Sequence, residues 1–155
     1  MNTKPLHLTQ EGLEELKKEL EGILNHKLPQ ATERVRLARE QGDLAENSEY
    51  HAAREDLNFI QGRVEELEAL IAKATVVKKA TGSKKVAIGS QVTVTSHAGD
   101  NHTFHIVGRY EADPADKKIS DESPLGLALL GRKEGEKVEY EAPVGKILYT
   151  IDKIH

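Results

Sequence analysis

Three acidic side chains that could contribute ligands to a metal ion follow a glycine in the stretch REQGDLAENSEYHAA, residues 39–53. They are Asp43, Glu46 and Glu49, each three residues from the next. Carboxylate oxygens are the hard ligands that Mg²⁺ prefers, but this ion keeps several waters and takes further ligands from its surroundings. Two or three carboxylates are too few for a private site. A metal held here therefore has to be shared with the acidic groups of a partner.

The same residues also fit a purely structural role at a helix boundary. Gly42 can adopt the left-handed conformation that ends a helix, and Asp43 followed by Glu46 matches the capping box that starts the next one. Glu49 is then a solvated acid, favoured by the positive end of the helix dipole. Because capping patterns are common, the residues alone favour this structural interpretation. A functional interpretation needs support from the elements that hold the turn.

Two apolar series flank the acidic turn. The second alternates steps of three and four, the pattern of a heptad coiled coil: Tyr50, Ala53, Leu57, Ile60, Val64, Leu67, Ile71 and Ala74. The first has extra steps of four that resemble a stutter: Leu13, Leu16, Leu20, Leu24, Leu28, Ala31, Val35 and Ala38. Only QGDL separates the two series, so the helices must run antiparallel as a hairpin.

The first arm of this hairpin contains a proline and is long. Pro29 removes one backbone hydrogen bond and crowds the carbonyl of Asn25, so it predicts a kink or a short break. From about Gln10 to Glu40 the arm spans roughly 45 Å at about 1.5 Å per residue. An arm of that length can carry the residues at its tip into another molecule.

The second half of the chain has the alternating, β-branched character of strands. Turn signals such as AGDN and APVG separate four strand-like runs, residues 86–96, 102–108, 136–143 and 145–155. Within SPLGLALLG, Ser123 is a helix N-cap, Pro124 a first helical residue and Gly131 a stop. This half therefore predicts a small antiparallel sheet packed on one short helix.

The two halves are expected to form separate domains. KKATGSKK, residues 78–85, breaks both helical and strand patterns with Gly, Ser and charge. We predict an α+β chain with a coiled-coil hairpin over residues 1–78, a linker over 79–85 and a β-rich domain over 86–155.

Composition limits the possible partners. The 155-residue chain has no cysteine, so disulfides and thiolate metal sites are excluded, and no apolar run approaches the ~20 residues of a membrane span. The N-terminal residues lack the pattern of a signal peptide, so we expect a cytoplasmic protein without a membrane partner. Residues 1–78 hold 11 Lys and Arg against 15 Asp and Glu, whereas residues 79–155 hold 11 of each. An acidic hairpin is poorly suited to gripping phosphate backbones, which favours a protein surface or a cation as partner.

Two long stretches of the chain resemble a known family. AREQGDLAENSEYHAAREDLNFIQGRVEELE and ISDESPLGLALLGRKEGEKVEYEAPVGKILYTIDKI are similar to the two domains of the bacterial Gre transcript cleavage factors, in particular the GreA branch, and the resemblance covers nearly the whole chain. It implies an N-terminal antiparallel coiled coil and an FKBP-like C-terminal domain without isomerase activity. It also implies a transcription elongation factor that is not itself an enzyme but stimulates the hydrolytic activity of RNA polymerase.

The resemblance assigns roles to the acidic turn. It implies that the globular domain docks at the secondary channel of bacterial RNA polymerase and that the coiled coil enters the channel of backtracked complexes. By the family pattern GDLxENxEY, Asp43 and Glu46 help to hold a second Mg²⁺ shared with the polymerase and to activate water for RNA cleavage, which rescues arrested complexes. Glu49 also matches, either as part of the acidic field or as support for the helix. The isolated chain is not expected to bind Mg²⁺ tightly.

Two further groups are candidates for contacts. Arg39 and Arg54 lie near the tip on opposite arms and can touch the 3′ segment of the nascent RNA, although pairing with nearby glutamates is an alternative. The family's polymerase-docking edge corresponds to Asp121, Glu122, Ser123 and Pro124, where a plain helix cap explains Ser-Pro equally well.

Three functions of other classes remain as alternatives. An anti-Gre factor would block the channel without cleavage, but it is expected to alter the tip, and GDLAENSEY is intact here. A prolyl isomerase is suggested only by the implied fold, and the chain lacks Trp for an aromatic proline pocket. A coiled-coil adaptor or holdase remains if the tip is only a cap. Within the family, the acidic hairpin favours the GreA branch over GreB, whose coil is more basic.

Overall fold

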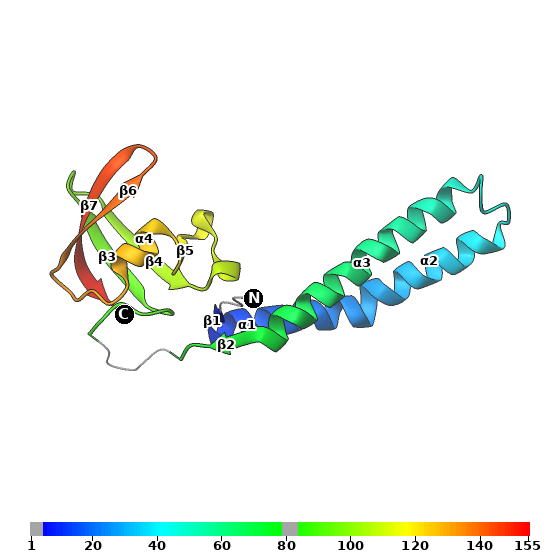
Figure 1. The fold of residues 1–155 in the computed structure, drawn as a ribbon, viewed down its shortest axis with the longest axis horizontal. Coiled ribbons are helices and arrows are strands. Elements are labelled where there is room, and N and C mark those ends of the chain that lie inside the picture. Colours follow the sequence, from blue (N-terminus) through cyan, green and yellow to red (C-terminus); the bar gives the residue numbers. More distant parts are fainter. Residues whose placement is uncertain (1–4, 79–83) are drawn as a thin grey trace. The chain divides into compact units, whose positions relative to one another are not determined.

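The computed structural model describes residues 5–78 and 84–155, and the chain divides into two compact units (Figure 1). One unit is Leu13–Lys73, a helical hairpin. The other combines the segment up to Gly12 with the segment from Ala74 to His155 and contains the strands. The chain is therefore of mixed α+β class, as predicted. Most of the predicted linker, 79–85, lies outside the described residues, so the predicted domain boundaries stay a prediction.

The hairpin consists of two long arms joined by a turn. The first arm contains helix α1 (Gln10–Gly22), the π-helical segment η1 (Ile23–Lys27) and helix α2 (Leu28–Glu40), and the second arm is helix α3 (Ser48–Lys73). Helices α2 and α3 lie side by side (Figure 1). The predicted seam is confirmed close to the turn, where four buried side chains cluster: Val35, Ala38, Tyr50 and Ala53. Further along α3, Leu67 is fully buried.

The first arm is interrupted just before Pro29, as predicted. In η1 the N–H of Leu28 donates to the carbonyl of Ile23, five residues back, so this turn of the helix contains an extra residue. Pro29 has no N–H to offer the carbonyl of Asn25, and a wider turn relieves the crowding by its ring. The extra residue changes which side chain faces the seam: Ile23 is 4% exposed and Leu24 is 41% exposed. The prediction that Leu24 belongs to the seam is wrong for this reason.

Among the described residues of the second unit, five strands form one curled sheet in the order β5-β4-β3-β7-β6 (Figure 1). The strands are β3 (Gln91–Ser96), β4 (Asn101–Val107), β5 (Lys118–Ser120), β6 (Lys137–Ala142) and β7 (Gly145–Ile154). The four predicted runs overlap β3, β4, β6 and β7, which pair with one another antiparallel. Strand β5 pairs parallel to β4, which the prediction of a purely antiparallel sheet missed. Three residues are too few to show an alternating pattern.

Helix α4 (Pro124–Leu129) closes the core of this sheet. Leu125 and Leu129 pack among Val92, Ile106 and Ile151, all nearly or fully buried. The predicted start of the helix is confirmed, because the N–H of Gly126 donates to Ser123 Oγ at 3.0 Å. Gly131 follows the helix with φ +76°, as a stop residue should.

A small pair of strands belongs to the same unit. Strand β1 (Leu6–Leu8) pairs parallel to β2 (Ala74–Val76), which the sequence analysis did not predict. Ala74, the last predicted seam position, lies in β2 instead of in the helix. Thr9 then caps α1 by accepting the N–H of Gly12, while Glu111 accepts the N–H of Thr9 at 2.9 Å. No helix among the described residues is both long and apolar enough to cross a membrane.

Candidate functional site

The turn at the end of the hairpin is longer than the sequence suggested. Helix α2 ends at Glu40 and α3 begins at Ser48, so residues 41–47 connect them, not QGDL alone. Gly42 has φ +75° and donates its N–H to the carbonyl of Arg39 at 3.1 Å, which confirms the predicted helix end. Asp43 follows with φ +42°, also left-handed. Two successive left-handed residues turn the chain away from the axis of α2.

The residue that caps α3 is Asn47, not Asp43. The N–H of Tyr50 donates to Asn47 Oδ1 at 2.9 Å, three residues into the helix. The predicted capping box of Asp43 and Glu46 is therefore wrong; the two are joined only by a backbone turn, in which the Glu46 N–H donates to the Asp43 carbonyl at 3.1 Å. Asn is as good an N-cap as Asp, so Asn47 followed by Ser48 was the signal that was overlooked.

Without a capping role, Asp43 and Glu46 present their carboxylates to solvent. Both residues are exposed, and neither makes an ion pair or a side-chain hydrogen bond with any residue in the described part of the chain. Leu44, between them, is 43% exposed at the same tip. The described residues contain no group of three or more His, Asp or Glu side chains able to hold a metal ion. Chemically, the tip offers two free oxygen-donor groups and no complete site.

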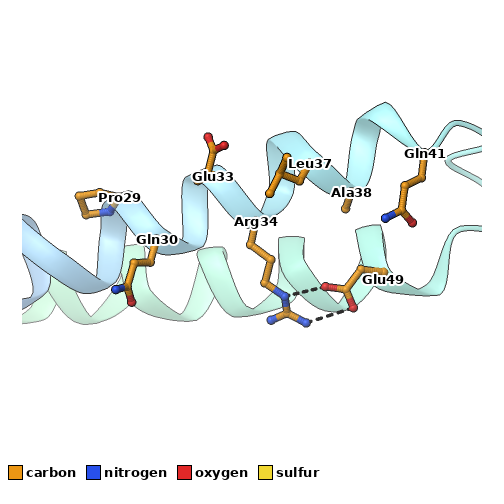
Figure 2. A pocket seen from close by; sticks show the side chains of 8 residues that line it. All are labelled: Pro29, Gln30, Glu33, Arg34, Leu37, Ala38, Gln41 and Glu49. Atoms are coloured by element: carbon orange, nitrogen blue, oxygen red, sulfur yellow. Dashed lines mark hydrogen bonds and ion pairs between the residues drawn. The ribbon is translucent and has the colours of Figure 1, made fainter.

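Glu49, the third candidate acid, is engaged within the hairpin. Arg34 of α2 donates from Nε to Glu49 Oε1 at 2.7 Å and from Nη2 to Oε2 at 3.3 Å (Figure 2). Hydrogen bonding to Arg34 and its positive charge lower the pKa of the Glu49 carboxyl. Arg34 Nη1 also lies 3.8 Å from Asp56. Glu49 therefore joins the two arms, and its two predicted roles, in the acidic field or in support of the helix, stay predictions.

A shallow groove of about 710 Å³ runs along the α2 face beside this ion pair (Figure 2). Its lining residues are Pro29, Gln30, Glu33, Arg34, Leu37, Ala38, Gln41 and Glu49. Most belong to α2, and Glu49 alone comes from α3. Asp43 and Glu46 are not among them, so the groove is distinct from the exposed acids of the turn.

Arg39 and Arg54 share a tyrosine that the sequence analysis assigned only to the seam. The Arg39 guanidinium lies over the Tyr50 ring, 5.7 Å from its centroid. Hydrogen bonding from Arg39, together with the charges of Arg39 and Arg54, lowers the pKa of the Tyr50 hydroxyl. Within the described residues neither arginine forms an ion pair with a glutamate, the alternative considered above. Their contact with RNA stays a prediction.

The predicted docking residues lie around the start of α4 in the second unit. Ser123 is occupied as the helix cap, and its Oγ also donates to the carbonyl of Ser120 at 2.7 Å. Glu122 is exposed and lies 3.8 Å from Arg109, while the Asp121 N–H donates to Val107 at the end of β4. Pro124 is exposed at the first turn of the helix. This geometry accounts for the cap, and the contact with polymerase stays a prediction.

Two family descriptions match nearly the whole chain. Residues 6–76 match the N-terminal domain of the GreA/GreB transcription elongation factors, and residues 80–155 match their C-terminal domain.

Individual proteins are similar over the same span. A transcription elongation factor GreA of Lactococcus lactis is 43% identical over 153 residues, 97% of this chain and 98% of that protein. A transcription elongation factor GreA of Bacillus subtilis is 42% identical over 152 residues, 97% of each. Among solved structures, GreA factor homolog 1 (Gfh1) of Thermus thermophilus is 29% identical, with 98% of this chain and 99% of that chain covered at a TM-score of 0.46. The chain therefore belongs to the GreA/GreB family of transcription elongation factors.

Proposed function

We propose that this chain binds bacterial RNA polymerase in backtracked elongation complexes and stimulates the polymerase's own endonucleolytic cleavage of the RNA, which rescues arrested complexes in the cytoplasm. The observation that carries the proposal is the state of the tip acids. Asp43 and Glu46 are exposed, lie three residues apart in the turn and have no partners among the described residues. Carboxylates with this freedom at the end of a hairpin are available to a metal ion on another molecule.

The residue types fit a metal-dependent hydrolysis that is completed in trans. Asp43 and Glu46 would hold Mg²⁺ together with acidic groups of the polymerase, because hard oxygen donors suit this ion and the tip supplies only two of them. When bound, a second metal ion stabilises the attacking and leaving oxygens of a phosphoryl displacement. A tip carboxylate can also orient the attacking water or accept its proton. The chain itself then supplies two side chains to a reaction centre that belongs to the polymerase.

The second unit has the role of docking in this proposal. Glu122 and Pro124 are exposed at the start of α4, next to the Ser123 cap, and offer an edge for docking. Docking of that edge raises the effective concentration of the hairpin tip at its target. Arg39 and Arg54, which converge on Tyr50, are available to the RNA 3′ segment from the two sides of the hairpin.

The test is to incubate the full chain with a backtracked elongation complex, with and without Mg²⁺, and to measure RNA length on a gel. We expect shortened RNA that can be extended again, only when Mg²⁺ and polymerase are present. The same RNA without polymerase should stay intact, and so should RNA held by a catalytically inactive polymerase. Cleavage of free RNA would make the chain a nuclease. Binding that protects the backtracked RNA from cleavage would make it a channel-blocking factor, the main competing function.

A further inference from the structure

One side chain connects the end of α2, the turn and the start of α3. Asn47 Nδ2 donates to the carbonyl of Ala38 at 2.7 Å, in the last helical turn of α2, and lies 3.3 Å from the carbonyl of Gly42. Its Oδ1 accepts the N–H of Tyr50 at 2.9 Å, in the first turn of α3. The side chain is partly buried, between the exposed acids of the tip and the buried Ala38 and Tyr50.

These bonds use both ends of the amide, and they leave only one orientation. An oxygen placed where Nδ2 lies would face two carbonyl oxygens, and a nitrogen placed where Oδ1 lies would face a backbone N–H. An N-cap needs only an acceptor, which Asp and Ser also supply. The two donor bonds to Ala38 and Gly42 therefore go beyond capping and are specific to the amide.

Few other contacts in the described part of the chain hold the turn to the arms; one is His51 Nε2 of α3, which lies 3.4 Å from the carbonyl of Ala45. The ion pair between Arg34 and Glu49 also joins α2 to α3, but its side chains are 44% and 48% exposed, and exposed ion pairs contribute little. Within the turn, the Gly42 N–H to Arg39 and the Glu46 N–H to Asp43 close local backbone turns without reaching the opposite arm. Asn47 alone among these reaches back from the start of α3 to the backbone of α2.

We infer that Asn47 is a positioning residue for RNA cleavage: its amide holds the turn at Gly42 against both arms and so fixes the direction in which Asp43 and Glu46 leave the hairpin. This inference rests on the proposed function and adds a residue to it. Asn47 touches neither metal nor RNA in this role. A carboxylate pair shared with another molecule's metal must be held within a fraction of an ångström, and a displacement of about 1 Å can cost on the order of 100-fold in rate.

The experiment replaces the amide while keeping the cap. Asn47→Ser and Asn47→Asp both leave an acceptor for the Tyr50 N–H and remove the donors to Ala38 and Gly42. One substitution is neutral and the other adds a charge, so an effect common to both arises from the lost donors. The matched control is Ser48→Ala, an exposed position next to Asn47. The reference is the double variant Asp43→Asn, Glu46→Gln.

Each variant is measured for RNA cleavage at saturating concentration with a backtracked complex, for competition with wild type, and for thermal melting by circular dichroism. We expect both Asn47 variants to cleave about 10- to 100-fold more slowly. They should compete like wild type and keep the wild-type melting profile, and Ser48→Ala should match wild type throughout.

Three results would overturn the inference. One is wild-type cleavage by both Asn47 variants while the double variant is inactive, which leaves the proposed function intact. Another is a loss of cleavage in the Asn47 variants that always comes with a lower melting temperature or with weaker competition against wild type. That result would show that Asn47 has a structural role alone. The last is wild-type cleavage by the double variant, which refutes the proposed function as well.

Discussion

In the described part of the chain, several acidic side chains on the arms of the hairpin pair with arginines, whereas the two acids at the tip do not. Along the described arms, the carboxylates that pair with arginines form the pairs Arg34–Glu49, Arg34–Asp56, Arg36–Glu33, Arg36–Glu40, Arg63–Glu19 and Arg63–Glu66. At the tip, Asp43 and Glu46 have no such partner among the described residues, although Arg39 is close in sequence and lies over Tyr50 instead. An excess of negative charge thus remains where the hairpin ends.

Acidic residues therefore have two roles in this hairpin: some form ion pairs within it, and two at the tip are open to solvent. Pairing with Arg36 lowers the pKa of Glu33, and pairing with Arg34 lowers that of Glu49, so these acids are satisfied within the hairpin. A cation that approached them would have to displace a guanidinium. The tip acids offer their oxygens without that competition. Number and spacing of acids alone do not identify a metal-binding position; Asp43 and Glu46 differ from arm acids such as Glu55, also unpaired among the described residues, because they lie in the turn between the helices.

The largest predicted difference in cleavage rate is between a variant that lacks two negative charges at the tip and one that lacks two on an arm. Asp43→Asn with Glu46→Gln should slow cleavage by roughly 100-fold or more, the range for losing a positioned acid or base. Glu33→Gln with Glu40→Gln removes the same charge around Arg36 and should change cleavage by less than about 2-fold. Both double variants should unfold within about 1 kcal/mol of wild type, because all four side chains are exposed. Equal losses from the two pairs would show that total charge matters, not the tip.

A second prediction concerns the contribution of the arms to the stability of the fold. Leu67 on α3 is fully buried, so Leu67→Ala should lower the free energy of unfolding by about 2–5 kcal/mol. Phe59 on the same helix is 76% exposed, and Phe59→Ala should change the free energy of unfolding by less than about 0.5 kcal/mol. Thermal melts followed by helical circular dichroism compare the two. A large effect at Phe59 would mean that this side chain is covered by something outside the hairpin.

The smallest predicted effect is that of the ion pair behind the tip. Arg34→Gln should lower the melting temperature by only about 2 °C at pH 7, since exposed ion pairs contribute little. The folded-state pKa of Glu49 is depressed below its usual 4.5, so the stabilisation is present above that pH and is lost as pH falls through the lowered pKa. The melting curves of wild type and variant should therefore converge below pH 4.5. A difference that persists in acid would point to Asp56 or to packing of the arginine stem.

Much of the scaffold could be predicted because its signals are periodic and long. The α3 seam, four of the strands, the Ser123 cap and the helix end at Gly42 all follow from local patterns. The pairing of β1 with β2 could not be predicted, because each has three residues and they lie far apart in sequence. The displacement of Leu24 from the seam depends on a π turn whose extra residue leaves no periodic signal.

The position of the candidate acids follows from the sequence, but their local structure does not. Asp43 and Glu46 lie in the turn between the helices, as predicted, whereas the pattern D-x-x-E predicts a helix cap that does not form, and their role in catalysis stays a prediction. Asp43 and Asn47 are equivalent in capping propensity, and what decides between them is where α3 begins, at Ser48 directly after Asn47. The roles of Tyr50 and Arg34 depend on contacts between arms, which a pattern along one helix does not contain.

The central claim is that Asp43 and Glu46 act through a metal ion shared with the polymerase, and the most direct measurement is the Mg²⁺ dependence of RNA cleavage at saturating factor. Wild type is compared with Asp43→Asn and with Glu46→Gln in the same backtracked complex. We predict that each variant needs at least about 10-fold more Mg²⁺ for half-maximal cleavage or loses its maximal rate, while its affinity for the complex is unchanged. Wild-type Mg²⁺ dependence and rate in both variants would contradict the claim.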